Sequence, residues 1–450
     1  MGIYAILVAV IMALPSPGVL GQDSWPMYQF KSDNNAVFAS PDWKLRWSTT
    51  LGGKINGGLS IVGNTIYVES FDRTIYALDA RTGEERWDSG IANIAMNTPV
   101  VVGNTVFAGT GGNHWFILHR KRAYLGILGG DSVDAIDTQS GRRRWSYRTP
   151  GADMPTGILA RTGDADEFVF SDGAGHLRAL DAETGALLWD TTFPGISSMS
   201  SLAAYGDTLI GSSGMTPEVT LAAYASGNPS VIGHLSWTWA ARASDGKILW
   251  KSAYGMADCS PTIGDGRVFV EGVDAPVTPA QVKAGIFLDP KLSYQAVVVA
   301  LDARTGTKLW GYRDPDLGPT HPAGSYEFAI AGVYSSGTFY DSLNFSKNFA
   351  AFDGRTGRVL WKIPTEGAVK MSAVVKDGKV YVGDNAGYFY VIDARTGMVR
   401  AKLHFPEIFT TSPPVIVGKT IFIADTDTVY ALPIADIDRG YLPVLKLTQP

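Results

Sequence analysis

Short runs of β-branched and aromatic residues recur along the chain, separated by tight turns rich in Gly, Asn and Asp. Residues 98–110, 260–272, 372–384 and 412–425 each read as a strand, a turn and a second strand. After the pairs at 98–110 and 260–272 comes another apolar stretch that ends in Asp, followed by a Gly-containing turn and a Trp. The combined pattern predicts a repeated unit of four antiparallel strands.

The second half of this unit is a motif with fixed spacing. Its full copies cover residues 77–87, 135–145, 179–189, 300–310 and 351–361, with partial copies at 240–250 and 391–401. Arg242 replaces the Asp in the first partial copy, and Ala401 replaces the Trp in the second. We expect the Asp to accept backbone N–H bonds in the turn and the Gly to supply a positive φ. The Trp then lies on the outer strand and packs against a neighbouring unit.

Counting the outer-strand position predicts eight units. The positions are Trp47, Trp87, Trp145, Trp189, Trp250, Trp310, Trp361 and Ala401. Residues 412–432 provide three inner strands without a fourth, and residues 43–50 provide a fourth strand without inner ones. Pairing these ends leaves no open sheet edge. The sequence therefore predicts an all-β, eight-bladed β-propeller of four-stranded antiparallel blades, closed by the N-terminal outer strand.

Four units are longer than a minimal blade of about 40 residues. The extra segments are 109–130, 211–238, 272–297 and 313–335. Insertions in repeat folds tend to emerge on one face, which is often the binding face. The alternative is that they are packing loops or loops that form a homodimer.

Composition excludes several classes of function. The net charge is −5 and there is no block of Lys or Arg, which argues against nucleic acid as a partner. Cys259 is the single cysteine, so neither an intrachain disulfide nor a cysteine-based metal cluster can form. The histidines show no ligand spacing, and we expect no metal site.

The N-terminus resembles a secretory signal. Residues 3–14 form an apolar run that is too short to span a bilayer, and small residues follow it. We expect a signal peptide over 1–21, a lead-in over 22–39, the propeller over 40–432 and a tail over 433–450. The protein is therefore expected to be exported to the periplasm or the extracellular space, with an uncleaved anchor as the alternative and no transmembrane segment.

The repeated A-x-D-x-x-T-G-x-x-x-W motif resembles the tryptophan-docking motif of the pyrroloquinoline-quinone (PQQ) propeller superfamily, and the resemblance spans residues 40–432. It implies three possible functions. A quinoprotein dehydrogenase has a vicinal Cys–Cys disulfide, which one cysteine cannot form, so PQQ is not expected as a cofactor. A BamB-like scaffold is non-catalytic and has envelope proteins as partners. A tetrathionate hydrolase cleaves a small anionic sulfur substrate.

The third possibility rests on Cys259. Alignment of the inner strands places Cys259 level with Asn97, beside Asp258 and across from Lys370, where blade connections reach the mouth of the central channel. A lone cysteine is otherwise most often a small buried apolar side chain. A thiol in a cationic pocket can attack a sulfur–sulfur bond that has a good leaving group.

Resemblance to tetrathionate hydrolases implies a pocket cysteine and a nearby Asp. Cys259 is the candidate nucleophile, with Asp274 as the first choice for the acid and Asp258 as the second. A dianionic substrate requires cations, and protonated imidazoles add charge at low pH. The candidate substrate-binding residues are Lys370, Arg148, His321, His404 and Asn97.

Overall fold

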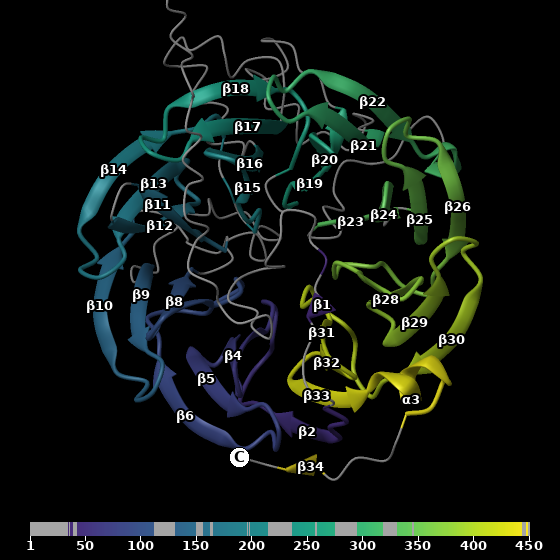
Figure 1. The fold of residues 1–450 in the computed structure, drawn as a ribbon, viewed down its shortest axis with the longest axis horizontal. Coiled ribbons are helices and arrows are strands. Elements are labelled where there is room, and N and C mark those ends of the chain that lie inside the picture. Colours follow the sequence, from purple (N-terminus) through teal and green to yellow (C-terminus); the bar gives the residue numbers. More distant parts are fainter. Residues whose placement is uncertain are drawn as a thin grey trace, which may run out of the picture.

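Eight antiparallel sheets surround a central axis in the computed structural model (Figure 1). It describes residues 35, 37–38, 43–111, 131–149, 156–162, 165–195, 197, 199–214, 236–256, 259–274, 295–317, 331–343, 346–442 and 447–448. The predicted signal peptide lies outside the described residues. The eight sheets confirm the predicted all-β propeller, and we number the blades in chain order.

Each of the first seven blades is a four-stranded sheet whose strands run from the axis to the rim in chain order. Blade 1 contains β3 (Ser60–Val62), β4 (Thr65–Ser70), β5 (Thr74–Asp79) and β6 (Glu85–Gly90). Blade 2 contains β7 (Val100–Val102), β8 (Thr105–Thr110), β9 (Ser132–Asp137) and β10 (Arg143–Arg148). Blade 3 contains β11 (Ile158–Thr162), β12 (Ala165–Ser171), β13 (His176–Asp181) and β14 (Leu187–Thr192). Blade 4 contains β15 (Ala203–Tyr205), β16 (Thr208–Gly214), β17 (Ser236–Arg242) and β18 (Ile248–Ser252). Blade 5 contains β19 (Thr262–Gly264), β20 (Arg267–Asp274), β21 (Gln295–Asp302) and β22 (Lys308–Arg313). Blade 6 contains β23 (Val333–Ser335), β24 (Thr338–Leu343), β25 (Asn348–Asp353) and β26 (Val359–Pro364). Blade 7 contains β27 (Val374–Lys376), β28 (Lys379–Gly383), β29 (Tyr388–Asp393) and β30 (Val399–His404).

Blade 8 joins the two ends of the chain. Strands β31 (Val415–Val417), β32 (Thr420–Ala424) and β33 (Thr428–Pro433) are completed by β2 (Trp47–Thr50), which pairs antiparallel with β33. This pairing confirms the predicted closure. Two short strands from the segments predicted as lead-in and tail extend the same sheet: β1 (Val37–Phe38) runs parallel to β31, and β34 (Leu447–Thr448) runs parallel to β2.

The repeat motif forms the turn that precedes each outer strand. In blade 6, Asp353 accepts hydrogen bonds from the Arg355 and Thr356 amides at 3.1 and 2.8 Å. The turn glycine, Gly357, has φ +73°, and a Cβ there would lie 2.5 Å from Cε3 of Trp310 in blade 5. The indole N–H of Trp310 also donates to the Gly354 carbonyl at 3.0 Å. Seven of the eight blades are docked onto the next in this way, by a Trp ring that rests on the glycine of its neighbour's turn.

The two partial copies of the motif have local substitutes. Where Arg242 replaces the Asp, Asp245 accepts hydrogen bonds from the Arg242 guanidinium and the Lys247 amide. Ala401 faces Gly440, which lies two residues after the end of helix α3 (Ile434–Asp438). The helix occupies the place of a repeat turn next to β30 and buries Ile437. A large Trp ring is therefore replaced by a small side chain under a helix.

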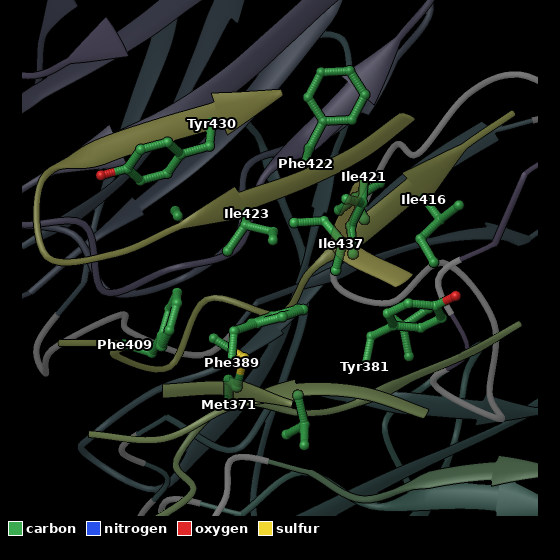
Figure 2. Close-up of a cluster of buried hydrophobic side chains, with 14 of the residues drawn as sticks. Met371, Tyr381, Phe389, Phe409, Ile416, Ile421, Phe422, Ile423, Tyr430 and Ile437 are labelled. Atoms are coloured by element: carbon green, nitrogen blue, oxygen red, sulfur yellow. The ribbon is translucent and has the colours of Figure 1, made fainter. Parts of the chain in front are cut away.

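Aromatic and aliphatic side chains fill the boundaries between blades. Figure 2 shows this for blades 7 and 8, where Phe389 and Phe409 lie opposite Ile423, whereas Phe422 points to the other side of β32, toward Trp47. The three Phe side chains and Ile423 are at most 1% exposed. Burial of each such side chain contributes about 1.5–3 kcal/mol, so the boundaries supply much of the stability of the ring.

The strands that lead into the predicted insertions all end on one face of the ring. In a four-stranded meander, the turns from second to third strand and the connections to the next blade share a face; we call it the insertion face. The insertions follow β8, β16 and β20, which are second strands, and β22, which is an outer strand. Residues 112–130, 215–235, 275–294 and 318–330 themselves lie outside the described part. Among the described residues, no helix is long and apolar enough to cross a membrane.

Candidate functional site on the insertion face

Cys259 lies in the connection between β18 and β19, on the insertion face. Its side chain is 1% exposed, and its Sγ lies 3.7 Å from Sδ of Met256. The Met256 amide donates to Oγ of Ser212 in blade 4 at 2.7 Å. The thiol is therefore covered in this structure, so it reaches solvent only if the connection moves.

The other predicted residues are distributed unequally. Lys370 is half-buried in the connection between β26 and β27, and Asn97 is buried in the connection between β6 and β7. Both lie on the insertion face with Cys259. Arg148 is an exposed residue at the end of the outer strand β10, and His404 occupies the same position on β30. These two belong to the rim of the insertion face.

The side chains of the two candidate acids, Asp274 and Asp258, lie outside the described part of the structure. Asp274 is the last residue of β20, where its backbone pairs opposite Gln295. Asp258 and His321 lie outside the described residues. Their proposed roles stay predictions from the sequence.

Lys54 is a cation that the sequence reasoning missed. It is half-buried in the connection between β2 and β3, which is the same type of position as that of Lys370. Burial and the nearby positive charge of Lys370 both lower the pKa of Lys54. The signal was available in the sequence, because Lys54 lies in the segment that joins the N-terminal outer strand to the first inner strand of blade 1.

Apolar side chains lie beside these cations. Nζ of Lys54 is 5.7 Å from the centroid of the Phe71 ring, and the Phe71 amide donates to the Lys54 carbonyl at 2.9 Å. Phe71 in turn packs with Met96 and Met199, which come from the connections into blades 2 and 4. The insertion face thus combines two ammonium groups with an apolar cluster near the axis.

Side-chain hydroxyls link the inner connections into a chain of hydrogen bonds. Backbone amides donate to the Oγ atom of the next blade at four successive boundaries: Gly58 to Thr98, Thr98 to Thr156, Thr156 to Ser201 and Ser201 to Ser260, at 2.8–3.2 Å. Ser260 directly follows Cys259. These bonds fix the backbone of the connection next to the thiol, and we assign them a structural role.

The chain does not fit the quinone that the superfamily name implies. The single thiol cannot form a vicinal disulfide, and Phe71, Met96 and Met199 are in contact at the insertion face. The described residues also contain no group of three or more His, Cys, Asp or Glu placed to hold a metal ion. We therefore derive no chemistry through PQQ.

Fold and docking turns together define a PQQ-like eight-bladed propeller. A family model described as outer membrane protein assembly factor BamB matches residues 36–208 and 238–436, and the chain belongs to this family.

Two curated relatives show how wide this family is in function. The chain is 28% identical over 404 residues to a tetrathionate hydrolase of Acidithiobacillus ferrooxidans, covering 85% of this chain and 73% of the relative. It is 23% identical over 408 residues to BamB of Shewanella oneidensis, covering 87% and 89%. The solved quinohemoprotein alcohol dehydrogenase of Comamonas testosteroni matches with a TM-score of 0.63 at 12% identity, covering 95% of this chain and 82% of that one, which shows the fold alone.

Proposed function

We propose that this protein is a hydrolase of polythionates, converting tetrathionate and water into thiosulfate, sulfur and sulfate. The observation that carries the proposal is similarity to tetrathionate hydrolase over 85% of the chain. Its geometric support is the shared face: Cys259, Lys54 and Lys370 all lie in connections between blades on the insertion face. A thiol supplies the nucleophile, and two ammonium groups suit a substrate with a sulfonate at each end.

The proposed reaction begins with attack by the Cys259 thiolate on the central S–S bond of tetrathionate. Thiosulfate leaves with the bonding electron pair, and the enzyme holds Cys–S–S–SO₃⁻. Water then attacks the sulfonate sulfur, which releases sulfate and two protons and leaves the persulfide Cys–S–S⁻. Loss of one sulfur atom restores the thiolate. Asp274, or Asp258 as the second choice, positions the water and accepts a proton.

Lys54 and Lys370 bind the terminal sulfonates in this proposal. Partial burial strengthens their attraction for an anion, because the local dielectric is lower than that of water. The covered state of Cys259 requires the β18–β19 connection to move when substrate binds. A thiolate that is shielded until then is protected from oxidation in an exported protein.

The deciding experiment is thiosulfate release from tetrathionate at acidic and neutral pH. We expect Cys259→Ser to lose at least about a thousandfold in kcat, because serine is a far weaker nucleophile at these pH values. Lys54→Gln and Lys370→Gln are expected to raise KM more than they lower kcat. Lys247→Gln is the matched control, because Lys247 is an exposed lysine on a turn of the opposite face. Full turnover by Cys259→Ser overturns the proposed nucleophile.

Export is part of the same proposal. The apolar run over residues 3–14 and the predicted cleavage after residue 21 support a mature protein in the periplasm or outside the cell. We propose the insertions as its homodimer contact. N-terminal sequencing of the protein recovered from its native host tests the cleavage site.

A second candidate function is a non-catalytic scaffold that binds envelope proteins. The burial of Cys259 favours it, since a buried thiol next to a methionine is ordinary core packing. Wild-type protein without turnover at either pH would support the scaffold and reject the hydrolase.

A further inference from the structure

Two acidic side chains meet inside the boundary between blades 5 and 6. Glu271 lies on β20 and is 3% exposed, and Asp341 lies on β24 and is fully buried. The charge of Asp341 acts on the Glu271 carboxyl, and Glu271 acts in turn on that of Asp341. Phe269 and Phe339 lie two residues earlier on the same two strands and stack with ring centroids 4.6 Å apart, so Glu271 and Asp341 face each other across the boundary.

Few other polar groups reach this pair. One oxygen of Asp341 accepts the Ser342 amide at 2.8 Å. The other Asp341 oxygen and both Glu271 oxygens have no hydrogen-bond donor in the described part of the chain. The residues paired opposite on the flanking strands are Val298 of β21 and Ala350 of β25. Among the described residues, the charged group that acts on each of these two carboxyls is therefore the other carboxyl.

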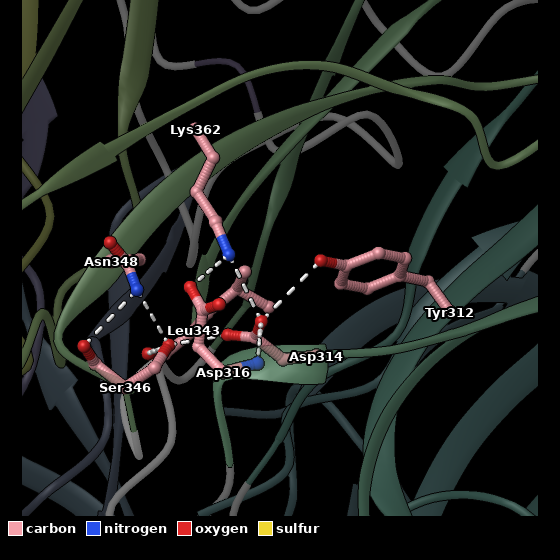
Figure 3. Close-up of polar contacts among 7 residues, drawn as sticks. All are labelled: Tyr312, Asp314, Asp316, Leu343, Ser346, Asn348 and Lys362. Carbon is pink, nitrogen blue, oxygen red and sulfur yellow. Dashed lines mark hydrogen bonds and ion pairs between the residues drawn. The ribbon is translucent and has the colours of Figure 1, made fainter. Parts of the chain in front are cut away.

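A cation at the same boundary is engaged elsewhere. Lys362 of β26 donates to Asp314 at 3.1 Å and to Asp316, both of which directly follow β22 (Figure 3). Asp314 also accepts from Ser346 and Tyr312. Lys362 is thus engaged by two other carboxylates, and no cation among the described residues pairs with Glu271 or Asp341.

Two adjacent buried carboxylates cannot both be ionised at low cost. Burial and the charge of Asp341 raise the pKa of Glu271 well above its usual range. Burial likewise raises the pKa of Asp341 to about 7. A proton held between the two oxygens removes one charge and converts two acceptors into a donor and an acceptor.

We propose that Glu271 and Asp341 share a proton and form an acid-dependent clasp between blades 5 and 6. At acidic pH the shared proton joins the blades. When it is lost, two like charges face each other in a low-dielectric boundary and this part of the ring loosens. The inference concerns stability and is independent of the proposed hydrolase activity.

The direction of the effect follows from proton linkage. Unfolded Asp and Glu have pKa values of about 4, so the unfolded chain releases these protons first as pH rises. Since the folded state holds more protons than the unfolded state between about pH 4 and about pH 7, rising pH favours unfolding. Each retained proton changes the unfolding equilibrium constant up to about tenfold per pH unit across this window.

The test is denaturant unfolding of the full chain at a series of pH values between about 4 and 8, comparing wild type with Glu271→Gln. Glutamine donates a hydrogen bond to Asp341 without needing a shared proton. We expect the two proteins to match at the acidic end and the wild type to weaken by at least about tenfold in its unfolding constant toward neutral pH, relative to the variant. Glu407→Gln, at an exposed site between β30 and β31, is the control and should keep the wild-type pH dependence.

A second measurement guards against a misfolded variant. Amide hydrogen exchange in wild type, corrected for its intrinsic pH dependence, should show loss of protection along β20 and β24 as pH rises, before β28 and β32 lose theirs. Asp341→Asn should abolish that local difference, as Glu271→Gln does. Equal pH dependence in wild type and Glu271→Gln, or uniform loss of protection in all blades, overturns the clasp.

Discussion

The boundary between blades 5 and 6 is held by two contacts that use carboxyl groups in opposite ways. At the rim, Trp310 rests on the turn that begins at Asp353. Inside, Glu271 contacts Asp341. Hydrogen bonds from the side chain and backbone of Thr356 lower the pKa of the Asp353 carboxyl, whereas burial raises the pKa of Asp341 to about 7.

The surroundings of each aspartate determine this difference. Asp353 is solvated and surrounded by N–H and O–H donors, so it is stable as an anion. Asp341 is desolvated and faces another acid, so it is stable when a proton is present. Acid therefore weakens the rim contact and strengthens the inner one. The pKa of the repeat aspartate is lowered in six turns, at Asp79, Asp137, Asp181, Asp302, Asp353 and Asp393.

The largest effect is expected from removing the apolar part of the rim contact. Trp310→Ala deletes a ring that packs on Phe269 and Phe352 and lies over Gly357. We expect a loss of about 3 kcal/mol in the free energy of unfolding, since large aromatic deletions cost about 3–5 kcal/mol in cores and Trp310 is only half-buried.

The pH dependence of stability should survive this substitution, because Trp310 carries no titratable group. Denaturant unfolding at several pH values provides both numbers. A change in slope with pH, rather than a uniform decrease, would show that the rim and inner contacts are not separate.

The next effect is a maximum in the stability of the wild type at mildly acidic pH. Below about pH 4 the repeat aspartates are protonated in the unfolded chain before the folded one, so stability falls with acid. Above it the inner pair loses stability toward about pH 7. Burial, opposed by the Tyr430 hydroxyl, also raises the pKa of Asp425 to about 6, which adds to the loss on the neutral side.

Each limb has a slope of up to about 1.4 kcal/mol per pH unit for each proton involved. Thermal unfolding across the pH range measures both limbs. If the melting temperature stays constant from acidic to neutral pH, the Glu271–Asp341 pair does not destabilise the protein as predicted.

The rim contacts could be predicted from the sequence and the inner ones could not. Asp353, Gly357 and Trp310 lie in one repeat register, so spacing alone predicted the turn, the positive φ and the docking ring. Local compensation escaped that reasoning: nothing near Ala401 in sequence indicated that α3 takes the place of the missing turn. A repeated motif predicts only the features that all blades share. The exceptions depend on contacts between segments that are distant in the sequence.

Site residues show the same limit. Strand register correctly placed Cys259, Asn97 and Lys370 in connections on one face, but register does not determine how deeply a side chain is covered, and Cys259 is 1% exposed. Glu271 and Asp341 are separated by 70 positions and stand out only as acids within apolar strands. Their pairing depends on how two twisted sheets pack, which periodicity does not encode.

The smallest effect is expected from the rim carboxylate itself. Asp353→Ala removes an acceptor for the Arg355 amide and for the amide and hydroxyl of Thr356. We expect a cost of about 1 kcal/mol or less at neutral pH, because the turn is solvated and water replaces part of what is lost. The cost should shrink toward zero as pH falls through the lowered pKa of Asp353, since the protonated side chain accepts less well.

Glu271→Gln changes stability in the opposite pH range, so urea titrations of both variants at acidic and neutral pH separate the two contacts. If Asp353→Ala costs as much at low pH as at neutral pH, the carboxylate charge contributes nothing to the turn, and the contrast between rim and interior is lost.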